Sequence, residues 1–336
     1  MHREVREIPA AVDALLTQGA PAVVEAATAL RTRDPAFLVS VARGSSDHAA
    51  TYFKYATELL AGVPVASVGP SVASIYGRAL RLDRSACLAV SQSGKSPDIV
   101  RMAEMATRQG ALSVALTNHA DSDLARTAAH TLDLHAGTER SVAATKTFVN
   151  SAVAAIWLLA EWQDDTDLRA AIHGLPDMLA RAVAADWSPL AEAITACTSL
   201  FCLGRGPALA MSAEAALKFK ETCRLHAESY SSAEVLHGPV SIVGRDFPVL
   251  ALAAADAAEA SLAQVADEIA GKGATVFVTS REAHHATALP VTRTAHPLTD
   301  PIALIVSFYA TVERVARARG LDPDEPRHLR KVTETI

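Results

Sequence analysis

Two short serine-rich segments carry the first side chains that could bind a ligand. Residues 44–48 (GSSDH) and 91–97 (SQSGKSP) each follow an apolar run of strand length and precede a helical pattern. Small hydroxyl groups and backbone N–H donors at a helix start suit a phosphate, and Pro97 suits the first helical position. Neither segment is a Walker loop or a GxGxxG turn, which removes the main support for ATP hydrolysis and nicotinamide binding. One loop alone would indicate helix capping by Ser45 or Ser96, but two such loops favour a ligand.

A polar stretch in the second half offers groups for proton transfer. Lys218 and Glu221 are three residues apart, so on a helix they share a face where a cation and a base can meet one substrate. His237 precedes Gly-Pro in a predicted loop, and histidine titrates near neutrality. The alternative is a solvated helix face, but only seven of the 31 basic residues are lysine. Since arginine supplies most of the basic residues of this chain, we expect the lysines at 95, 146, 218 and 331 to have specific roles in a site.

Apolar runs of strand length alternate with longer Ala- and Leu-rich helical patterns. This alternation predicts an α/β fold with parallel sheets flanked by helices, doubly wound and flavodoxin-like. In the first half we expect strands at Phe37–Ala42, Val63–Val68, Ala86–Ser91, Leu112–Leu116 and Thr131–Leu134. We expect helices at His48–Leu60, Pro97–Gln109 and Ser122–Ala129, and from Ala143 to about Glu161.

The second half repeats the first at similar spacing, which predicts a duplicated domain. Arg43-Gly44 and the strand and helix around it recur 162 residues later around Arg205-Gly206, with a helix expected over Ala208–Arg224. The later elements recur as Val249–Leu252, a helix over Glu259–Ala270, the run from Gly273 and a closing helix over Ile302–Ala318. The loop 91–96 recurs as Ala253-Ala254-Ala255-Asp256, which lacks hydroxyl groups. We therefore expect the first half alone to bind the anion.

Length and composition limit the function classes. The 336 residues exceed the roughly 250–300 that one core organises, so two domains are expected. The formal net charge of -6, with no Lys/Arg cluster, argues against nucleic-acid binding. No apolar run reaches the ~20 residues of a membrane span, and the N-terminus lacks a signal-peptide pattern, so we expect a cytoplasmic protein. Four cysteines without CxxC spacing predict buried thiols, and His284-His285 lack a third ligand, so no metal site is expected.

Several motifs together resemble the sugar isomerase (SIS) domain family. The resemblance is to the tandem-SIS isomerase half of glucosamine-6-phosphate synthase and to its stand-alone deaminase relatives, and it covers nearly the whole chain in order. The motifs are Arg43-Gly44-Ser45-Ser46, Ser91-Gln92-Ser93-Gly94, Ala136-Gly137-Thr138-Glu139, Val142-Ala143-Ala144-Thr145-Lys146, Leu203-Gly204-Arg205-Gly206, Ala216-Leu217-Lys218-Phe219-Lys220-Glu221, His226-Ala227-Glu228-Ser229-Tyr230 and Glu234-Val235-Leu236-His237-Gly238-Pro239. The tail at 326–331 is similar to the family's closing segment, whose lysine enters the active site.

The resemblance implies roles for these residues. The phosphate of an amino sugar would be held by Gly44, Ser45, Ser46, Ser91, Gln92, Ser93 and Ser96, and the pocket lined by Val142 and Ala143. Glu221 would move a proton between C1 and C2 with Lys218 beside it, and His237 would open the sugar ring from the neighbouring subunit of a homodimer. Lys331 corresponds to the synthase lysine that forms a Schiff base with fructose 6-phosphate. No cofactor is implied.

The motifs also suggest domain boundaries. We expect an N-terminal helical segment at 1–34, SIS domains at 35–165 and 196–320, a helical linker at 166–195 and a tail at 321–336 that enters the active site. Only about 35 residues precede the first strand, so we expect no glutaminase domain and no synthesis from glutamine. Arg43 and Lys95 depart from the family pattern, and their positive charge fits a phosphate.

The first functional hypothesis is a glucosamine-6-phosphate deaminase that yields fructose 6-phosphate and ammonia. Its substrate carries its own nitrogen, so we expect Lys331 to act as a fixed cation rather than as a nucleophile. The alternatives are a fructosamine-6-phosphate deglycase or a galactosamine-6-phosphate deaminase on the same fold. A non-catalytic phosphosugar sensor is the alternative from another class, but sensing would not need Glu221, His237 and Lys331.

Overall fold

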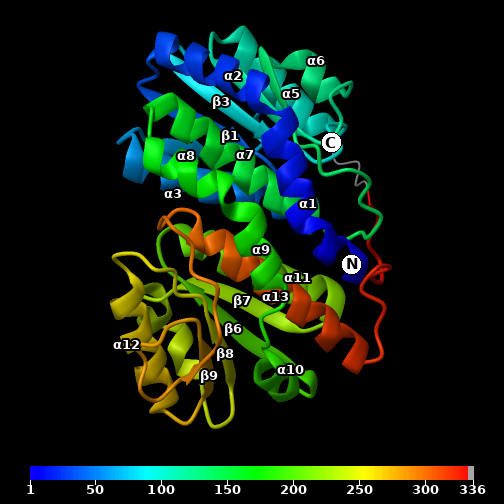
Figure 1. Ribbon diagram of the computed structural model, residues 1–336. Helices are drawn as coiled ribbons and strands as arrows, with labels where there is room; N and C mark the ends of the chain where they lie inside the picture. The colour runs from blue at the N-terminus through cyan, green and yellow to red at the C-terminus, as the bar shows by residue number, and fades with distance from the viewer. Residues whose placement is uncertain (332–336) are drawn as a thin grey trace. The chain divides into compact units, whose positions relative to one another are not determined.

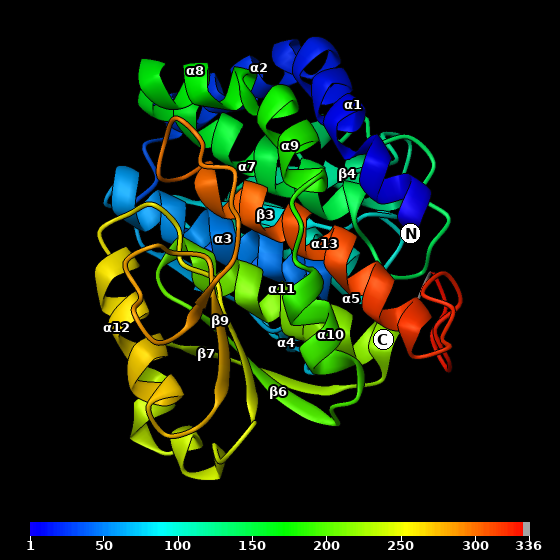
Figure 2. The same ribbon diagram turned by 60° about the horizontal axis from the view of Figure 1, so that its bottom comes forward.

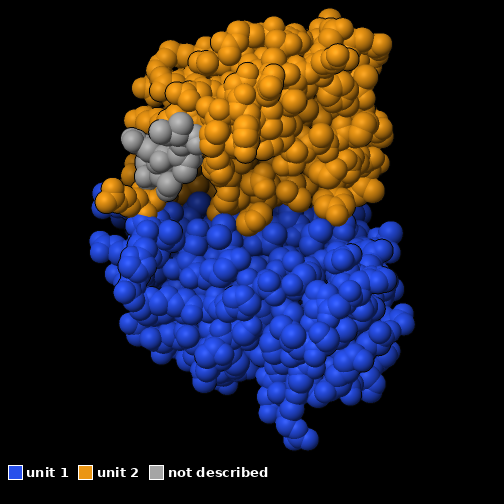
Figure 3. All heavy atoms as spheres, turned by 180° about the vertical axis from the view of Figure 1, so that it is seen from behind, with its two compact units in different colours: residues 1–9, 140–145, 174–329 blue, residues 10–139, 146–173, 330–336 orange. Residues whose placement is uncertain are grey.

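The computed structural model describes residues 1–331, so residues 332–336 of the predicted tail lie outside the described part. The chain divides into two compact units, which Figure 3 colours separately. Unit 1 comprises residues 1–9, 140–145 and 174–329, and unit 2 comprises residues 10–139, 146–173 and 330–336. Each unit contains one five-stranded sheet in which neighbouring strands pair in parallel. The predicted domain boundaries stay predictions.

Unit 2 arranges its strands in the order β2-β1-β3-β4-β5. Figure 1 labels β1 and β3 of this sheet among the helices of the unit. The strands are β1 (Phe37–Val41), β2 (Val65–Ser67), β3 (Ser85–Val90), β4 (Leu112–Thr117) and β5 (His130–Asp133). The helices are α1 (His2–Gln18, its first residues grouping with unit 1), α2 (Ala20–Arg33), α3 (Ser45–Leu60), α4 (Ser71–Ser74), α5 (Pro97–Arg108), α6 (Asp123–Thr127), α7 (Lys146–Gln163) and α8 (Thr166–His173). All five strands predicted for the first half are present, within a few residues of the expected bounds.

Burial explains why these elements form where they do. β3 is buried along its whole length, as expected for a central strand covered on both faces. α7 is apolar almost all round, and it packs against both α2 and α3. The loops beyond the carboxyl ends of the strands are where ligands bind in this class of sheet.

Unit 1 arranges its strands in the order β10-β9-β8-β6-β7. The strands are β6 (Ser199–Gly204), β7 (His226–Ser231), β8 (Pro248–Ala251), β9 (Thr275–Val278) and β10 (Thr287–Ala288). The helices are α9 (Leu175–Val183), α10 (Ser188–Thr195), α11 (Pro207–Cys223), α12 (Glu259–Ala270) and α13 (Asp300–Ala318), with the short 3-10 helices η1 (Glu234–His237) and η2 (Pro239–Ile242). α11 packs beside α13 (Figure 2).

The two sheets are copies of one another. Numbered within its own unit, each sheet has the strand order 2-1-3-4-5, in one case read from the opposite edge. Gly44 and Gly206 directly precede the equivalent helices α3 and α11 with nearly the same backbone angles, φ 55° and ψ -133° against φ 56° and ψ -136°. A positive φ of this size favours glycine. The predicted α/β fold with a duplicated, doubly wound domain is confirmed.

β7 and the start of α7 are among the elements that differ from the predictions. β7 pairs with β6 along its whole length, although its sequence HAESYS has no apolar run and no strand was predicted there. It is an edge strand, so few of its side chains need to be buried. α7 begins at Lys146 rather than at Ala143, because the preceding backbone bonds to other groups: the Ser141 N–H donates to the Glu4 carboxylate and the Val142 N–H to the Asp324 carbonyl.

Two further expectations concern burial and membranes. Three of the four cysteines are buried, and burial raises the pKa of the Cys87 thiol to about 12 and that of Cys223 to about 11. These thiols are therefore protonated near neutral pH. Within residues 1–331, the structure has no helix that is both long enough and apolar enough to cross a membrane.

Candidate functional site

In unit 2 the two serine-rich loops leave neighbouring strands, β1 and β3, at the same edge of the sheet. β1 continues toward β2 on one side and β3 toward β4 on the other, so the strand order reverses between the two loops. Ligands of open α/β sheets bind at such a point. Gly94 is required in the second loop, since it has φ +61° and a Cβ there would lie 2.0 Å from the Ser122 hydroxyl.

The loop after β3 is held by its own hydroxyl groups. The Ser91 hydroxyl accepts from the Gly94 N–H at 3.2 Å, and the Ser93 hydroxyl accepts from the Lys95 N–H at 3.3 Å. Ser96 occupies the cap position of α5, yet within residues 1–331 its side chain makes no capping hydrogen bond. Ser45 is the first residue of α3, and Gly44 before it occupies the N-cap position. Helix capping therefore does not account for Ser96.

A cavity of about 560 Å³ opens beside this loop within unit 2. Its described lining consists of Gln18, Gln92, Ser93, Lys95, Asn118, His119, Asp133, His135, Gly137, Thr138, Glu139 and Lys331. The structure thus brings Gln92 and Ser93 of the predicted phosphate loop together with Lys331 of the tail. Among the described lining residues, the other predicted phosphate ligands (Gly44, Ser45, Ser46, Ser91 and Ser96) are not present.

Lys331 reaches this cavity through a carboxylate that was given no role from the sequence. Its Nζ lies 2.9 Å from Oε2 of Glu139, whose side chain is fully buried. The same carboxylate accepts from the hydroxyl of Thr147 at 2.7 Å and from the Thr147 N–H at 3.2 Å. Glu139 lies in a motif that the sequence singled out, but its partner is 192 residues away, so the pairing had no local signal.

Buried side chains fix the segment that carries Glu139. Asn118 donates to the Gly137 carbonyl at 2.8 Å and accepts from the Ala136 N–H at 2.9 Å. Asn150 on α7 donates to the Leu134 carbonyl, and the Lys146 ammonium donates to the Thr138 carbonyl at 3.1 Å. The specific role that was expected for Lys146 is therefore to hold the backbone next to Glu139.

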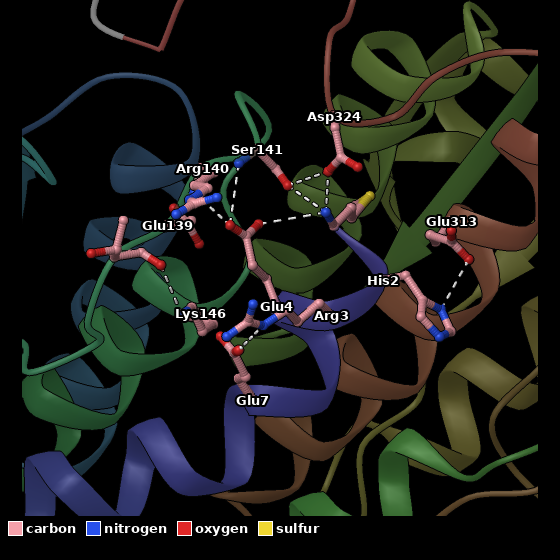
Figure 4. A network of polar contacts seen from close by, with 12 residues as sticks. His2, Arg3, Glu4, Glu7, Glu139, Arg140, Ser141, Lys146, Glu313 and Asp324 are labelled. Carbon is pink, nitrogen blue, oxygen red and sulfur yellow. Dashed lines mark hydrogen bonds and ion pairs between the residues drawn. The ribbon is translucent and has the colours of Figure 1, made fainter.

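The adjoining residues 140–145, which group with unit 1, are fixed by a second network (Figure 4). The Glu4 carboxylate accepts from the backbone N–H groups of Arg140 and Ser141, and the Ser141 hydroxyl bonds to Asp324. The Val142 N–H donates to the Asp324 carbonyl at 3.3 Å. These contacts hold Val142 and the buried Ala143, whose predicted place in the pocket lining stays a prediction.

In unit 1 the predicted base belongs to a buried ionic cluster on α11. Lys218 is fully buried, and its Nζ lies 2.5 Å from Glu221 Oε2 and 3.2 Å from Glu214 Oε1. Tyr309 on α13 donates to Glu214 at 2.8 Å. Burial alone would lower the pKa of Lys218, but Glu214 and Glu221 outweigh it and raise that pKa. Lys218 is thus a charged group that holds Glu221, whose own side chain stays 21% exposed.

His237 also belongs to unit 1, where it ends the short helix η1 rather than lying in a loop. Its side chain is exposed, and Gly238 after it has φ 148°. That turn ends η1 and starts η2 with Pro239. The predicted role of His237 at the site of a partner subunit stays a prediction.

The duplicate of the phosphate loop in unit 1 is filled by the protein itself. Ala255 lies four residues beyond Ala251 of β8, as Ser93 lies four beyond Ala89 of the equivalent β3. The Ala255 N–H donates to the buried carboxylate of Asp300 at 2.8 Å, and Arg293 neutralises that carboxylate at 2.6 Å. A carboxylate of the protein therefore contacts the loop that corresponds to the predicted phosphate loop.

One expectation about charge needs correction. Arg43 was expected to lend its positive charge to the phosphate cradle, but its Nε donates to Oδ2 of Asp98 at 2.6 Å, and its Nη2 contacts the same oxygen. Asp98 is fully buried, so the guanidinium neutralises a carboxylate of the protein. Lys95, which is exposed, keeps its charge beside the loop. Among residues 1–331, no cluster of three or more His, Cys, Asp or Glu side chains is arranged to hold a metal ion.

Comparison with known proteins places the chain in a family. The model of the SIS domain family matches residues 34–161 and 193–314. A glutamine–fructose-6-phosphate aminotransferase (isomerizing) of Symbiobacterium thermophilum is 32% identical over 358 residues, which cover 98% of this chain and 58% of that protein. The protein of the same name from Sulfolobus acidocaldarius is 30% identical over 300 residues, with coverages of 88% and 49%. The chain spans about half the length of the curated relatives it matches.

Solved structures also resemble this chain in sequence and fold. A crystal structure of a "putative phosphosugar isomerase" from Silicibacter pomeroyi is 64% identical and superposes with a TM-score of 0.94, covering 96% of this chain and 99% of that one. Glucosamine-6-phosphate deaminase from Thermotoga maritima is 18% identical with a TM-score of 0.75, over 94% of this chain and 99% of its own, which shows a shared fold. The protein belongs to the SIS domain family, and it carries two SIS domains in tandem.

Proposed function

We propose that this protein is a glucosamine-6-phosphate deaminase of the SIS type. The observation that carries the proposal is the cavity of unit 2, whose lining includes Gln92 and Ser93 of the serine-rich loop together with Lys331 of the tail. Phosphosugar chemistry is further supported by the names of the relatives, which include isomerising aminotransferases and a glucosamine-6-phosphate deaminase.

The proposed reaction needs only groups of the protein and water. His237 of the partner subunit assists ring opening, which frees the aldehyde at C1 beside the amine at C2. Glu221 removes the C2 proton, giving an enaminol, and returns a proton to C1. The nitrogen becomes an imine at C2, and water hydrolyses it to fructose 6-phosphate and ammonia. One water is consumed and no electrons are transferred.

Each proposed role fits the local chemistry of its residue. Lys218 neutralises the charge of Glu221 in the resting state and holds its carboxylate in place. Lys331, which Glu139 holds at the cavity, donates from its ammonium group to the open-chain oxygens or the phosphate. Ser91, Gln92, Ser93 and Ser96, with Ser45 and Ser46, bind the phosphate through hydroxyl, amide and backbone groups.

A fructosamine-6-phosphate deglycase is the second candidate. The cavity extends past the phosphate loop to His119, Asp133 and His135, which could meet a charged substituent on the substrate nitrogen. The test is a substrate panel of glucosamine, galactosamine and fructosamine 6-phosphates, with ammonia or amine and ketose 6-phosphate measured together. Glucosamine 6-phosphate should give ammonia at the highest kcat/KM. Binding without any product would support a sensor instead.

A further inference from the structure

Arg43 and Asp98 join the two loops that the proposed function assigns to the phosphate. Arg43 directly precedes Gly44 in the loop after β1, and Asp98 is the second residue of α5, directly after the loop 91–96. Arg43 Nε lies 2.6 Å from Asp98 Oδ2, while Asp98 Oδ1 accepts from the Ile99 N–H at 2.9 Å. One ion pair therefore connects both loops from one side.

The buried Asp98 carboxylate poses a problem for an anion site. It already takes a backbone donor at the start of α5, where a phosphate would also be attracted by the helix. An unpaired carboxylate at this position would repel a phosphate dianion. Arg43 removes that repulsion because its guanidinium neutralises the carboxylate, and two of its nitrogens contact one carboxylate oxygen, which ties the two loops together.

The second domain shows the same backbone without the pair. Arg205 stands in the position of Arg43, before Gly206 with its matching backbone angles, and it is exposed. The second residue of α12, the counterpart of Asp98 in α5, is Ala260. That domain has also replaced the serines of its loop by alanines and filled the loop with Asp300. The Arg43–Asp98 pair thus occurs only in the domain that keeps its hydroxyls, within residues 1–331.

We infer that Arg43 is a positioning residue for phosphate binding, which acts through Asp98 to neutralise and align the two serine-rich loops. The inference rests on the proposed function, because it takes these loops as the phosphate site. It assigns Arg43 no contact with the reacting carbons, so its loss should affect affinity for phosphorylated ligands and leave the proton transfer intact.

The test compares Arg43→Ala, Arg43→Lys and the double variant Arg43→Ala/Asp98→Asn with wild type, and Arg205→Ala serves as the matched control. We expect Arg43→Ala to raise KM for glucosamine 6-phosphate and the inhibition constant of inorganic phosphate by about tenfold or more, with kcat changed less than about threefold. The double variant should recover part of this loss, because the lone carboxylate is gone. Arg43→Lys should lie between, and Arg205→Ala should match wild type.

The outcomes separate the inference from the proposed function. Wild type that binds phosphate while Arg43→Ala binds it equally well would overturn the inference alone. A fall in kcat with unchanged KM would also overturn it. Wild type that binds neither glucosamine 6-phosphate nor inorganic phosphate would overturn the proposed function. If Arg43→Ala does not fold, Arg43→Lys and the charge-neutral double variant decide between the first two outcomes by the same constants.

Discussion

At Lys218 a single buried ammonium group is shared by two carboxylates, and this shapes the chemistry of the predicted base. Because its folded pKa is raised, the stabilisation by Lys218 is fully present below its ordinary pKa of 10.5 and is lost only as the pH rises through the folded value. Lys218 therefore stays charged throughout the neutral range. Glu221 keeps its position there while part of its side chain remains open to a substrate.

Tyr309→Phe tests the outer end of this cluster. It removes the hydroxyl that donates to the buried Glu214, and we expect a loss of about 1–3 kcal/mol in the free energy of unfolding, since a buried acceptor is left with one donor fewer. Tyr230→Phe is the matched control, because its hydroxyl bonds to Glu228 at 2.9 Å in a half-buried place. Urea unfolding of both variants gives the comparison. Equal losses would contradict the role given to the buried cluster.

Lys331→Arg tests whether the tail lysine works by charge. Arginine keeps the positive charge next to Glu139 but cannot form a Schiff base, so we expect a measurable part of the deaminase activity to remain. Lys331→Met, which keeps the length and loses the charge, should be far less active. Borohydride with fructose 6-phosphate provides the counter-test. Efficient trapping on Lys331 together with an inactive Arg variant would contradict the electrostatic role.

At the scale of elements, the loop after β3 and its duplicate after β8 form a natural pair of experiments. Replacing Ser93 and Ser96 by alanine should weaken substrate binding by about 0.5–1.5 kcal/mol for each neutral hydrogen bond lost, and by more where the partner is the phosphate charge. Ala254→Ser and Ala255→Ser are the controls and should change KM little. The measurement is KM for each variant. A phosphate found against residues 253–256 in a ligand-soaked crystal would contradict the assignment.

Sequence reasoning reached this loop because its signals are local. Gly94, Ser96 and Pro97 mark a turn into a helix, and the apolar run of β3 before them marks a buried strand. The sequence did not predict β7, because an edge strand can be polar and because its pairing with β6 depends on residues about 27 positions away. The contact of Glu139 with Lys331 was not predicted either, since it joins distant parts of the sequence.

At the scale of the whole molecule, the sequence predicted the duplication because both copies keep the same spacing between their elements, including Gly44 and Gly206 before equivalent helices. The sequence predicted only part of the difference between the two copies. The loss of hydroxyls at Ala253–Asp256 indicated that the second loop had changed, but Asp300 comes from the start of α13 and fills that loop from 45 residues away. Similarly, Arg43 was visible as an unusual charge, and only the structure pairs it with Asp98.

Subunit mixing tests the predicted homodimer. If His237 serves the site of its partner, a dimer of one Glu221→Gln and one His237→Ala subunit contains one intact site. Refolding an equal mixture of the two inactive variants should then restore about a quarter of wild-type activity, because half of the dimers are mixed and each has one working site of two. Each variant refolded alone is the control. No recovery in a mixture shown to contain mixed dimers would contradict the shared site.

The most direct test of the account is the turnover of glucosamine 6-phosphate by wild type and by Glu221→Gln, with ammonia and fructose 6-phosphate measured in the same samples. We predict equal amounts of both products from wild type. Glu221→Gln should still bind fructose 6-phosphate, but its kcat should fall by at least ~10²–10⁴-fold, the usual contribution of a general base. Near-normal release of ammonia by Glu221→Gln, or fructose 6-phosphate without ammonia from wild type, would contradict the account.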